Sequence, residues 1–276
     1  MLVDLHTHSD QSDGTRTPEA LVDHAHAAGI GVLALTDHDT TAGHRRFRAR
    51  AEAVGIVPVC GVEVSCIWEP GTCHLLGLGV RDDHGPLEQV LERIRGGRDA
   101  RNREIIAALN ALGHPLTIDE VAALAGGDVV GRPHFAAALM QRGIVTSRQE
   151  AFDQLLGKGR PAYRGRYRPE PEDAVALVTA AGGRAVLAHP AQLRADESQL
   201  VDLVRRLLPH GLWGIEAYFT GVTAEQIATY LALADDFGLA VTMGSDYHGD
   251  NKPHVAIGHY GAGKPLPGPC PPALLS

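Results

Sequence analysis

Short runs of apolar residues recur along the chain, and polar residues or glycines separate them. Runs that are apolar at consecutive positions are typical of strands buried on both faces of a sheet. Seven such runs predict strands at residues 2–5, 30–35, 56–64, 74–80, 185–188, 214–218 and 240–243.

Amphipathic segments follow most of these runs and predict helices. Thr17 and Pro18 suit the N-cap and first position of a helix, and Gly29 suits its C-terminal end. Further helices are expected near residues 42–54, 172–181, 198–208 and 224–237. Strands that alternate with helices indicate an α/β fold, here of barrel-like type.

The middle of the chain interrupts this alternation. Between about residues 86 and 168 the pattern favours short helices, at 119–125, 133–142 and 149–156, and no good strand. The segment is also rich in arginine. We therefore expect an inserted small helical lobe at residues 91–168, between a first part of the main domain (1–90) and a second part (169–276).

Composition narrows the class of protein. The chain has 276 residues, 44% of them hydrophobic, so a sizeable core is expected. Its net charge of -8 argues against a protein that covers nucleic acid non-specifically. Any anionic substrate would have to be bound by a local group of positive charges. No secretory signal or membrane-spanning run is visible, which makes a cytoplasmic location the default.

Histidine and carboxylate residues stand at the ends of the predicted strands. Seven of them directly follow or end a strand: His6, His8, Asp37, His38, Glu63, His189 and Asp246, with His248 two residues further. In parallel α/β barrels the carboxyl ends of the strands converge on one mouth. Imidazole with carboxylate suits Mn, Zn or Fe, so we expect a metal site there.

Three further residues of these types need comment. Asp13 lies on a short Ser-Asp-Gly turn that could fold back over the site. His74 precedes its apolar run, so either that strand is antiparallel or the sheet is irregular there. Glu216 ends the sixth strand and is open between a support for the site and a carboxylate at the edge of the core.

Five motifs in order resemble those of the polymerase-and-histidinol-phosphatase (PHP) family. They are D-L-H-T-H-S-D-x-S-D-G-T at 4–15, L-T-D-H-D-T at 35–40, G-V-E-V-S at 61–65, A-H-P at 188–190 and G-S-D-Y-H at 244–248. The resemblance implies a distorted (β/α)7 barrel with a trinuclear metal centre.

The same resemblance implies how nine residues share two or three divalent metal ions. The first ion would be held by His6, His8, Glu63 and Asp246. Glu63 would bridge to a second ion, completed by His74 and His189, and a third would be held by Asp13, His38 and His248. Mn²⁺ is the expected metal, with Zn²⁺, Fe²⁺ and Mg²⁺ left open.

Within the family, the chain resembles small stand-alone phosphoesterases with a helical insertion. Several act on the 3′-phosphate of nucleoside 3′,5′-bisphosphates or trim short RNA from its 5′ end. The matching segments are Arg-x-Arg at 101–103, G-R-P-H at 131–134 and G-K-G-R-P-A-Y at 157–163. They imply that substrate is bound by Arg101, Arg103, His134 and Lys158, for which a solvated helix face or a helix start is an equally good interpretation.

The expected enzyme is therefore a metal-dependent phosphoric ester hydrolase in which a hydroxide between two cations attacks phosphorus. Asp37 or His189 would relay a proton, and the residues do not choose between them. The expected partner is a small nucleotide-type phosphoester, with no long duplex nucleic acid, membrane or obligate protein. The alternatives are a histidinol-phosphate phosphatase, against which the arginine-rich insert argues, and a non-catalytic metal-binding module.

Overall fold

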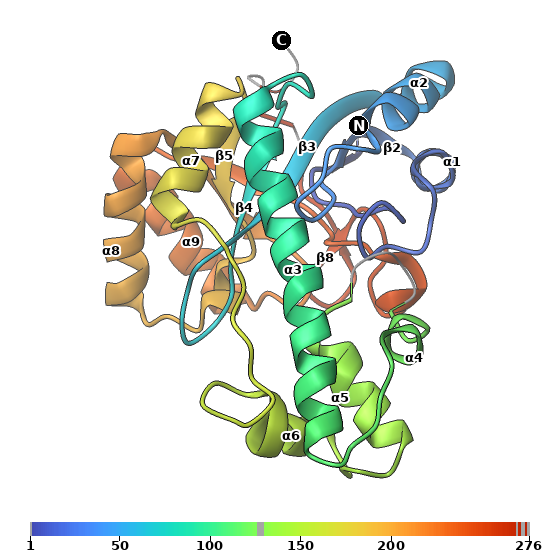
Figure 1. Cartoon of the computed structure of the whole chain (residues 1–276). Helices are drawn as coiled ribbons and strands as arrows, with labels where there is room; N and C mark the ends of the chain where they lie inside the picture. Colours follow the sequence, from blue (N-terminus) through green and yellow to red (C-terminus); the bar gives the residue numbers. More distant parts are fainter. Residues whose placement is uncertain (1, 126–129, 269, 272–273, 275–276) are drawn as a thin grey trace. The chain divides into compact units, whose positions relative to one another are not determined.

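The protein has an α/β fold built on one seven-stranded sheet (Figure 1). A computed structural model describes residues 2–125, 130–268, 270–271 and 274. The strands follow one another in sequence order across the sheet: β1 (Leu2–Asp4), β2 (Ile30–Leu35), β3 (Val57–Cys66), β4 (Cys73–Leu78), β5 (Arg184–Leu187), β6 (Leu212–Tyr218) and β7 (Ala240–Met243). All seven predicted strands are present, with ends shifted by a few residues.

Most neighbouring strands are parallel, and β4 is the exception. β1, β2 and β3 are parallel, as are β5, β6 and β7, whereas β4 is antiparallel to both β3 and β5. Because an antiparallel strand begins at the edge where its neighbours end, His74 at the start of β4 lies at the edge reached by Ser65 on β3. This reversal explains why His74 precedes its apolar run.

The segments that follow the first and last strands are hydrogen-bonded to each other. Leu5 donates its N–H to the carbonyl of Met243 at 3.1 Å, and Asp246 donates to the carbonyl of His6 at 2.9 Å. His8 donates to the carbonyl of Tyr247 at 2.9 Å. The segments after β1 and β7 therefore lie side by side, and both carry predicted metal ligands.

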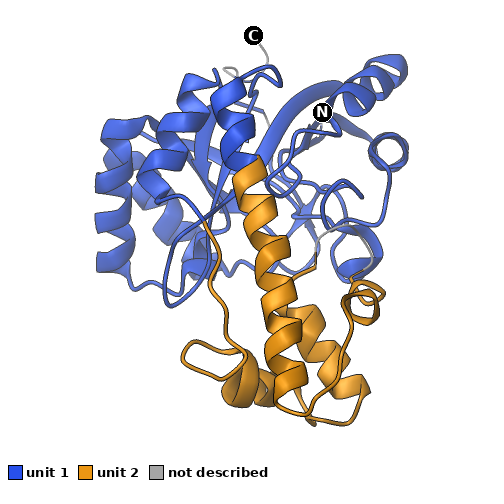
Figure 2. Cartoon of the chain, viewed as in Figure 1, with its two compact units in different colours: residues 1–91, 168–276 blue, residues 92–167 orange. Residues whose placement is uncertain are grey.

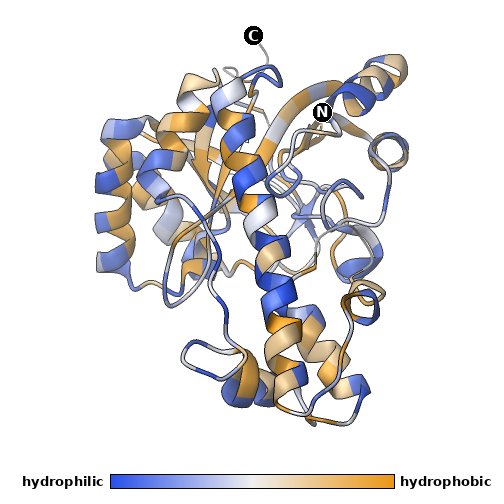
Figure 3. Cartoon of the chain, in the orientation of Figure 1, coloured by the Kyte–Doolittle hydropathy of each residue, from blue (hydrophilic) through white to orange (hydrophobic). Residues whose placement is uncertain are grey.

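Helices α1 (Pro18–Ala27), α2 (His44–Val54), α7 (Pro171–Ala180), α8 (Glu197–Leu207) and α9 (Ala224–Phe237) alternate with the strands. The predicted start of the first helix is confirmed, since the Thr17 hydroxyl accepts a hydrogen bond from the Ala20 N–H. Apolar and polar residues alternate in bands along α8, whose apolar members Leu200, Leu203, Val204 and Leu207 are buried (Figure 3).

Short elements connect these. They are the 3-10 helices η2 (Pro190–Leu193), η3 (Leu208–His210) and η4 (Gly249–Asn251), and the two-stranded pair β8 (His259–Tyr260) and β9 (Lys264–Pro265). Among the described residues, no helix is long and apolar enough to cross a membrane.

The chain divides into two compact units (Figure 2): unit 1 comprises residues 1–91 and 168–276, and unit 2 comprises residues 92–167. Helix α3 (Gly85–Ala111) begins in unit 1 and continues into unit 2. The sequence patterns did not predict this 27-residue helix, because Gly96 and Gly97 interrupt its periodicity.

The described part of unit 2 is helical. After α3 it contains α4 (Ile118–Ala122), α5 (Arg132–Gln141), α6 (Arg148–Ala151) and a π-helical turn, η1 (Phe152–Leu156). It has its own core, in which Leu109, Phe135, Leu139 and Leu156 are fully buried. The described part of unit 2 therefore has apolar partners of its own.

Candidate metal centre

Glu63 lies at the centre of the site and is fully buried. Its Oε2 atom lies 3.2 Å from His6 Nε2 and from His8 Nε2. The five imidazole nitrogens that lie 2.7–3.2 Å from its two oxygens belong to His6, His8, His38, His74 and His189. Sequence reasoning placed Glu63 at the end of its strand. In fact β3 continues to Cys66, because residues 61–66 pair with β4 after β2 has ended.

Two further carboxylates complete the cluster. Asp246 Oδ1 lies 3.4 Å from His8 Nε2 and 3.5 Å from His248 Nδ1. Asp13 Oδ1 lies 3.2 Å from His248 Nε2, and Asp13 Oδ2 lies 3.7 Å from His38 Nε2. The nine side chains predicted to bind metal thus gather at one place in unit 1.

The donor atoms fall into three overlapping groups, within each of which all atoms lie inside 4.8 Å. The groups are His6, His8, Glu63 and Asp246; His8, Asp13, His38 and His248; and His38, Glu63 and His74. The first group equals the set predicted for the first ion. In the third group His38 stands where His189 was expected, although His189 Nε2 also reaches Glu63 Oε1 at 2.7 Å. The assignment of each ligand to an ion remains a prediction.

The donor set fits divalent cations. Several buried donor atoms of the cluster form no hydrogen bond, namely His6 Nε2, His8 Nε2, His38 Nδ1, Glu63 Oε2 and His74 Nδ1. Leaving buried polar atoms unsatisfied costs free energy, and a cation between them removes that cost. Imidazole and carboxylate are ligands that Mn, Zn and Fe accept.

Backbone conformation aims two of these side chains. Asp246 has a φ of 58° and His189 a φ of 25°, in the region that residues other than glycine rarely adopt. Such strained residues persist only where the surrounding structure holds them, and they gather at functional sites. Both follow a strand directly or nearly so, which places their side chains at the cluster.

The charges of the cluster shift the pKa values of its members. Burial alone would lower the pKa of His8, but the neighbouring carboxylates of Asp246 and Glu63 raise it to about 9. Burial lowers the pKa of His38 to about 3, despite the carboxylates of Glu63 and Asp13. Burial would raise the pKa of Glu63, but His38, His74 and His6 hold it well below its usual range. These shifts favour the ionised form of Glu63 and the neutral form of His38, which are the forms that bind metal, whereas His8 has to lose a proton to bind it.

Glu216 supports the cluster from behind. Its Oε1 atom lies 3.0 Å from His6 Nδ1, and its Oε2 atom accepts a hydrogen bond from the backbone N–H of His189 at 2.7 Å. Of the two interpretations of Glu216 left open by the sequence, its contacts with His6 and His189 favour a supporting role. His6 is also packed closely against position 244, where a Cβ atom would overlap its side chain, which explains the glycine there.

We expect Glu216→Gln to weaken metal binding or activity by roughly 10- to 100-fold, the usual cost of losing a partner behind a metal ligand. A glutamine side chain has one acceptor oxygen, so it cannot accept from both His6 and His189. Metal titration of the variant, followed by calorimetry, measures the change. An affinity equal to that of the wild type would show that Glu216 is only a core carboxylate.

Asp37 is buried and holds a turn of the site. It accepts hydrogen bonds from the Ser9 N–H at 2.8 Å, from the Ser9 hydroxyl at 2.6 Å and from the Ser12 hydroxyl at 2.6 Å. The turn it holds carries Asp13. Asp4, which sequence reasoning missed, does similar work by accepting from the N–H groups of Ser245 and Gly258. Its position inside the first motif was the only available signal.

Lys252 is a second residue that sequence reasoning missed. Its Nζ atom lies 2.7 Å from Asp246 Oδ2, in the same unit as the cluster. Nothing in the local sequence marks it, because a lysine four residues after His248 is ordinary on a surface loop.

The residues predicted to bind substrate lie in unit 2, and some have structural partners there. Arg101 is buried and donates to the carbonyl of Val130 at 3.3 Å. His134 Nδ1 accepts from the Gly131 N–H at 3.0 Å, which caps α5. Arg103 and Lys158 are exposed. Their role in binding remains a prediction.

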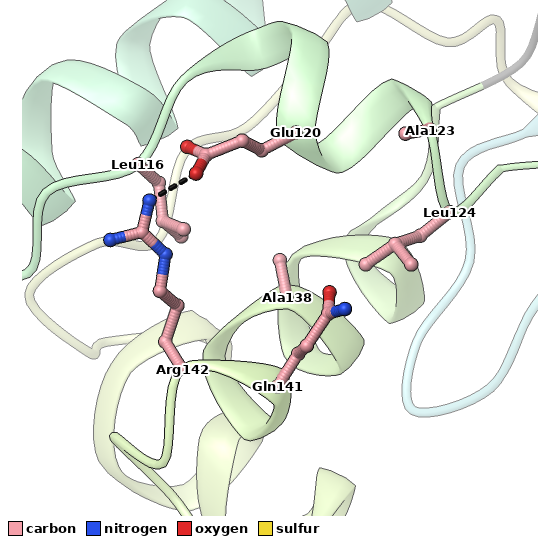
Figure 4. A pocket seen from close by; sticks show the side chains of 7 residues that line it. All are labelled: Leu116, Glu120, Ala123, Leu124, Ala138, Gln141 and Arg142. Atoms are coloured by element: carbon pink, nitrogen blue, oxygen red, sulfur yellow. Dashed lines mark hydrogen bonds and ion pairs between the residues drawn. The ribbon is translucent and has the colours of Figure 1, made fainter.

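Unit 2 also contains a pocket of about 450 Å³ that is distinct from these candidates (Figure 4). It is lined by Leu116, Glu120, Ala123, Leu124, Ala138, Gln141 and Arg142. The two charged groups at its rim, Glu120 and Arg142, form an ion pair with each other. Its lining is otherwise mostly apolar and contains none of the predicted site residues.

Together, a mainly parallel α/β sheet and a cluster of imidazoles and carboxylates at one edge define a metal-binding α/β protein. The PHP domain family matches residues 4–156, and the chain belongs to this family. The resemblance inferred from the five motifs is thus confirmed.

Relatives of known name cover nearly the whole chain. A 5′-3′ exoribonuclease from Haemophilus influenzae is 36% identical over 245 residues, which is 89% of each protein. A 3′,5′-nucleoside bisphosphate phosphatase from Chromobacterium violaceum is 34% identical and covers 93% of this chain and 90% of its own.

Two solved structures are similar to this chain in fold and sequence over nearly its whole length. One is an amidohydrolase from Chromobacterium violaceum with bound sulfate and no metal (TM-score 0.83, 34% identity, 97% of this chain and 92% of that one). Another, from Bifidobacterium adolescentis, is assigned as a metal-dependent phosphoesterase (TM-score 0.78, 31% identity, 94% and 91%).

Proposed function

We propose that this protein is a metal-dependent phosphoesterase that hydrolyses nucleotide-type phosphomonoesters. The single observation that carries the proposal is the buried Glu63 carboxylate with five imidazole nitrogens 2.7–3.2 Å from its oxygens. The names of the relatives, a 3′,5′-nucleoside bisphosphate phosphatase and a 5′-3′ exoribonuclease, support this substrate class. The proposed substrates are nucleoside 3′,5′-bisphosphates, at their 3′-phosphate, and short RNA, at its 5′ end.

The proposal includes two or three divalent ions, with Mn²⁺ foremost, held as the family resemblance implies. Bound cations would supply a nucleophilic water at neutral pH and neutralise charge on the phosphoryl group. These cations would be held by Glu63 on β3 and by Asp246 and Asp13 on loops, together with the histidines of the cluster. We also propose that the sheet closes as a distorted barrel with residues 91–168 as an inserted helical lobe.

Of the two predicted proton relays, the contacts favour His189. Both oxygens of Asp37 accept hydrogen bonds from Ser9 and Ser12, so this carboxylate positions the turn that carries Asp13. The His189 ring reaches Glu63 Oε1 at 2.7 Å, and its Nδ1 atom forms no hydrogen bond. A proton can therefore be held at Nδ1 without breaking an existing contact.

Binding of the remainder of the substrate is assigned to Arg101, Arg103, His134 and Lys158. The exposed Arg103 and Lys158 suit phosphate, since guanidinium and ammonium groups both donate to its oxygens. Arg101 suits a positioning role, because its guanidinium already donates to Asn102 and Val130.

A screen of phosphate release tests the proposal. The metal-reconstituted protein is given a nucleoside 3′,5′-bisphosphate, a short 5′-phosphorylated RNA and histidinol phosphate, with a chelated sample as the control. We expect turnover of the first two to exceed that of histidinol phosphate by at least about tenfold in kcat/KM, a difference of about 1.4 kcal/mol in transition-state binding. Preference for histidinol phosphate would assign the chain to the other activity, and no turnover of any would leave only metal binding.

A further inference from the structure

Lys252 and the metal cluster share one carboxylate. Asp246 Oδ2 lies 2.7 Å from Lys252 Nζ, whereas Asp246 Oδ1 lies 3.4–3.6 Å from nitrogens of His6, His8 and His248. The ammonium is thus separated from the donor atoms of the cluster by the width of one carboxylate. Lys252 is neither one of the nine predicted metal ligands nor one of the predicted substrate-binding residues.

The loop that carries Lys252 is tied to the loop that carries Asp13. The Asp250 N–H donates to the Thr15 hydroxyl at 3.0 Å, and the Asn251 amide donates to the Asp13 carbonyl at 2.7 Å. The backbone N–H of Lys252 donates to the carbonyl of Gly249 at 3.1 Å. These hydrogen bonds hold the backbone of Lys252 in place. The loop that carries Lys252 is thus held against the loop that carries the predicted metal ligand Asp13.

The Lys252 side chain remains accessible. It is 35% exposed, against 13% for Asp246 and 0% for Glu63. A lysine whose only task was to pair with a buried carboxylate would gain by being enclosed, because water weakens an ion pair. A partly exposed ammonium beside a cluster of ligands is instead available to an anion from solvent.

A cation bound by the cluster would change the charge balance at this position. It would neutralise part of the charge of Asp246 and repel the ammonium of Lys252. An ammonium beside divalent cations is stabilised when an anion lies next to both. Lysine is a point-charge donor with three N–H groups, which suits the oxygens of a phosphoryl group.

We propose that Lys252 donates a hydrogen bond to a phosphoryl oxygen of the bound phosphoester and is therefore a catalytic residue beside the metal ligands. This inference rests on the proposed function, since the phosphoester is the substrate assigned there. It adds to that function a protein-borne cation that binds the reacting group.

The test compares Lys252→Met and Lys252→Arg with Lys264→Met, which changes an exposed lysine on β9 of the same unit. Three quantities are measured for each: manganese content after reconstitution, the Kd of inorganic phosphate by calorimetry at saturating manganese, and kcat and KM for the bisphosphate. We expect Lys252→Met to keep its manganese and to bind phosphate roughly 10- to 100-fold more weakly, the usual cost of losing a charged hydrogen bond. Lys252→Arg should recover part of this loss, and Lys264→Met should match the wild type.

An unchanged phosphate Kd in manganese-saturated Lys252→Met would overturn the proposal, whatever its metal affinity. Loss of manganese with normal phosphate binding at saturation would show that Lys252 only orients Asp246. The phosphate measurement needs no turnover. A wild type that binds phosphate through Lys252 but hydrolyses no phosphoester would therefore refute the proposed function and the catalytic role, and would leave Lys252 as a phosphate-binding residue only.

Discussion

Glu63→Ala is expected to abolish turnover, with a loss in kcat/KM of at least about a thousandfold, because cation stabilisation of a phosphoryl transfer contributes several kcal/mol. The two oxygens of Glu63 lie near five imidazoles, so its loss removes a donor from two of the three ligand groups found among the described residues. The variant should also bind less metal. Steady-state assay of phosphate release and metal analysis of the purified protein measure both effects.

The matched control is Glu52→Ala, which removes an exposed carboxylate from α2 in the same unit. It should retain full activity and metal content. Circular dichroism and thermal unfolding should show Glu63→Ala still folded, since the core of unit 1 is unaltered. Activity of Glu63→Ala within tenfold of the wild type would remove this carboxylate from the site.

Removing metal is expected to stop turnover and to lower the unfolding temperature. Ligand that binds only the folded state at 100 times its Kd stabilises by about 2.7 kcal/mol. For a domain of this size each kcal/mol corresponds to about 2–4 °C, so chelation should lower the Tm by about 5–10 °C. Adding Mn²⁺ back should restore both activity and Tm. A Tm unaffected by chelation and reconstitution would contradict a cation among these buried donors.

The effect of metal should grow as the pH rises from 6.5 to 9. The pKa of His8 in the folded, metal-free protein is raised to about 9 from its ordinary value of 6.5. A raised pKa stabilises the fold fully below 6.5, and this stability is lost as the pH rises through 9. Metal requires neutral imidazole, so metal binding strengthens over the same range. The Tm difference between loaded and chelated protein should thus be larger at pH 9 than at pH 6.5.

The strands and the ligand cluster were predictable from local pattern, because buried strands and the residues at their ends leave a direct trace in the chain. His6, Asp37 and His189 could be placed at one edge only because parallel strands end together. His74 could not be placed that way. Its position depends on the antiparallel β4, and strand direction is set by pairing partners far away in sequence.

Other features left no local trace. The long helix α3 contains Gly96 and Gly97, and packing of the helix outweighs the low helix propensity of glycine. Lys252 and Asp4 act through partners brought close by the fold, at separations of 6 residues to Asp246 and 241 residues to Ser245. The sequence left two roles open for Glu216, as a support for the site or as a carboxylate at the edge of the core. Only its contacts with His6 and His189 favour the first role.

Crystals of the manganese-reconstituted protein, measured near the manganese absorption edge, would show whether these side chains bind metal. We expect anomalous density between His6, His8, Glu63 and Asp246, with further density beside His38, where the other two groups of donors meet. Anomalous density at other positions, or a cluster without any at saturating manganese, would contradict metal binding by these side chains.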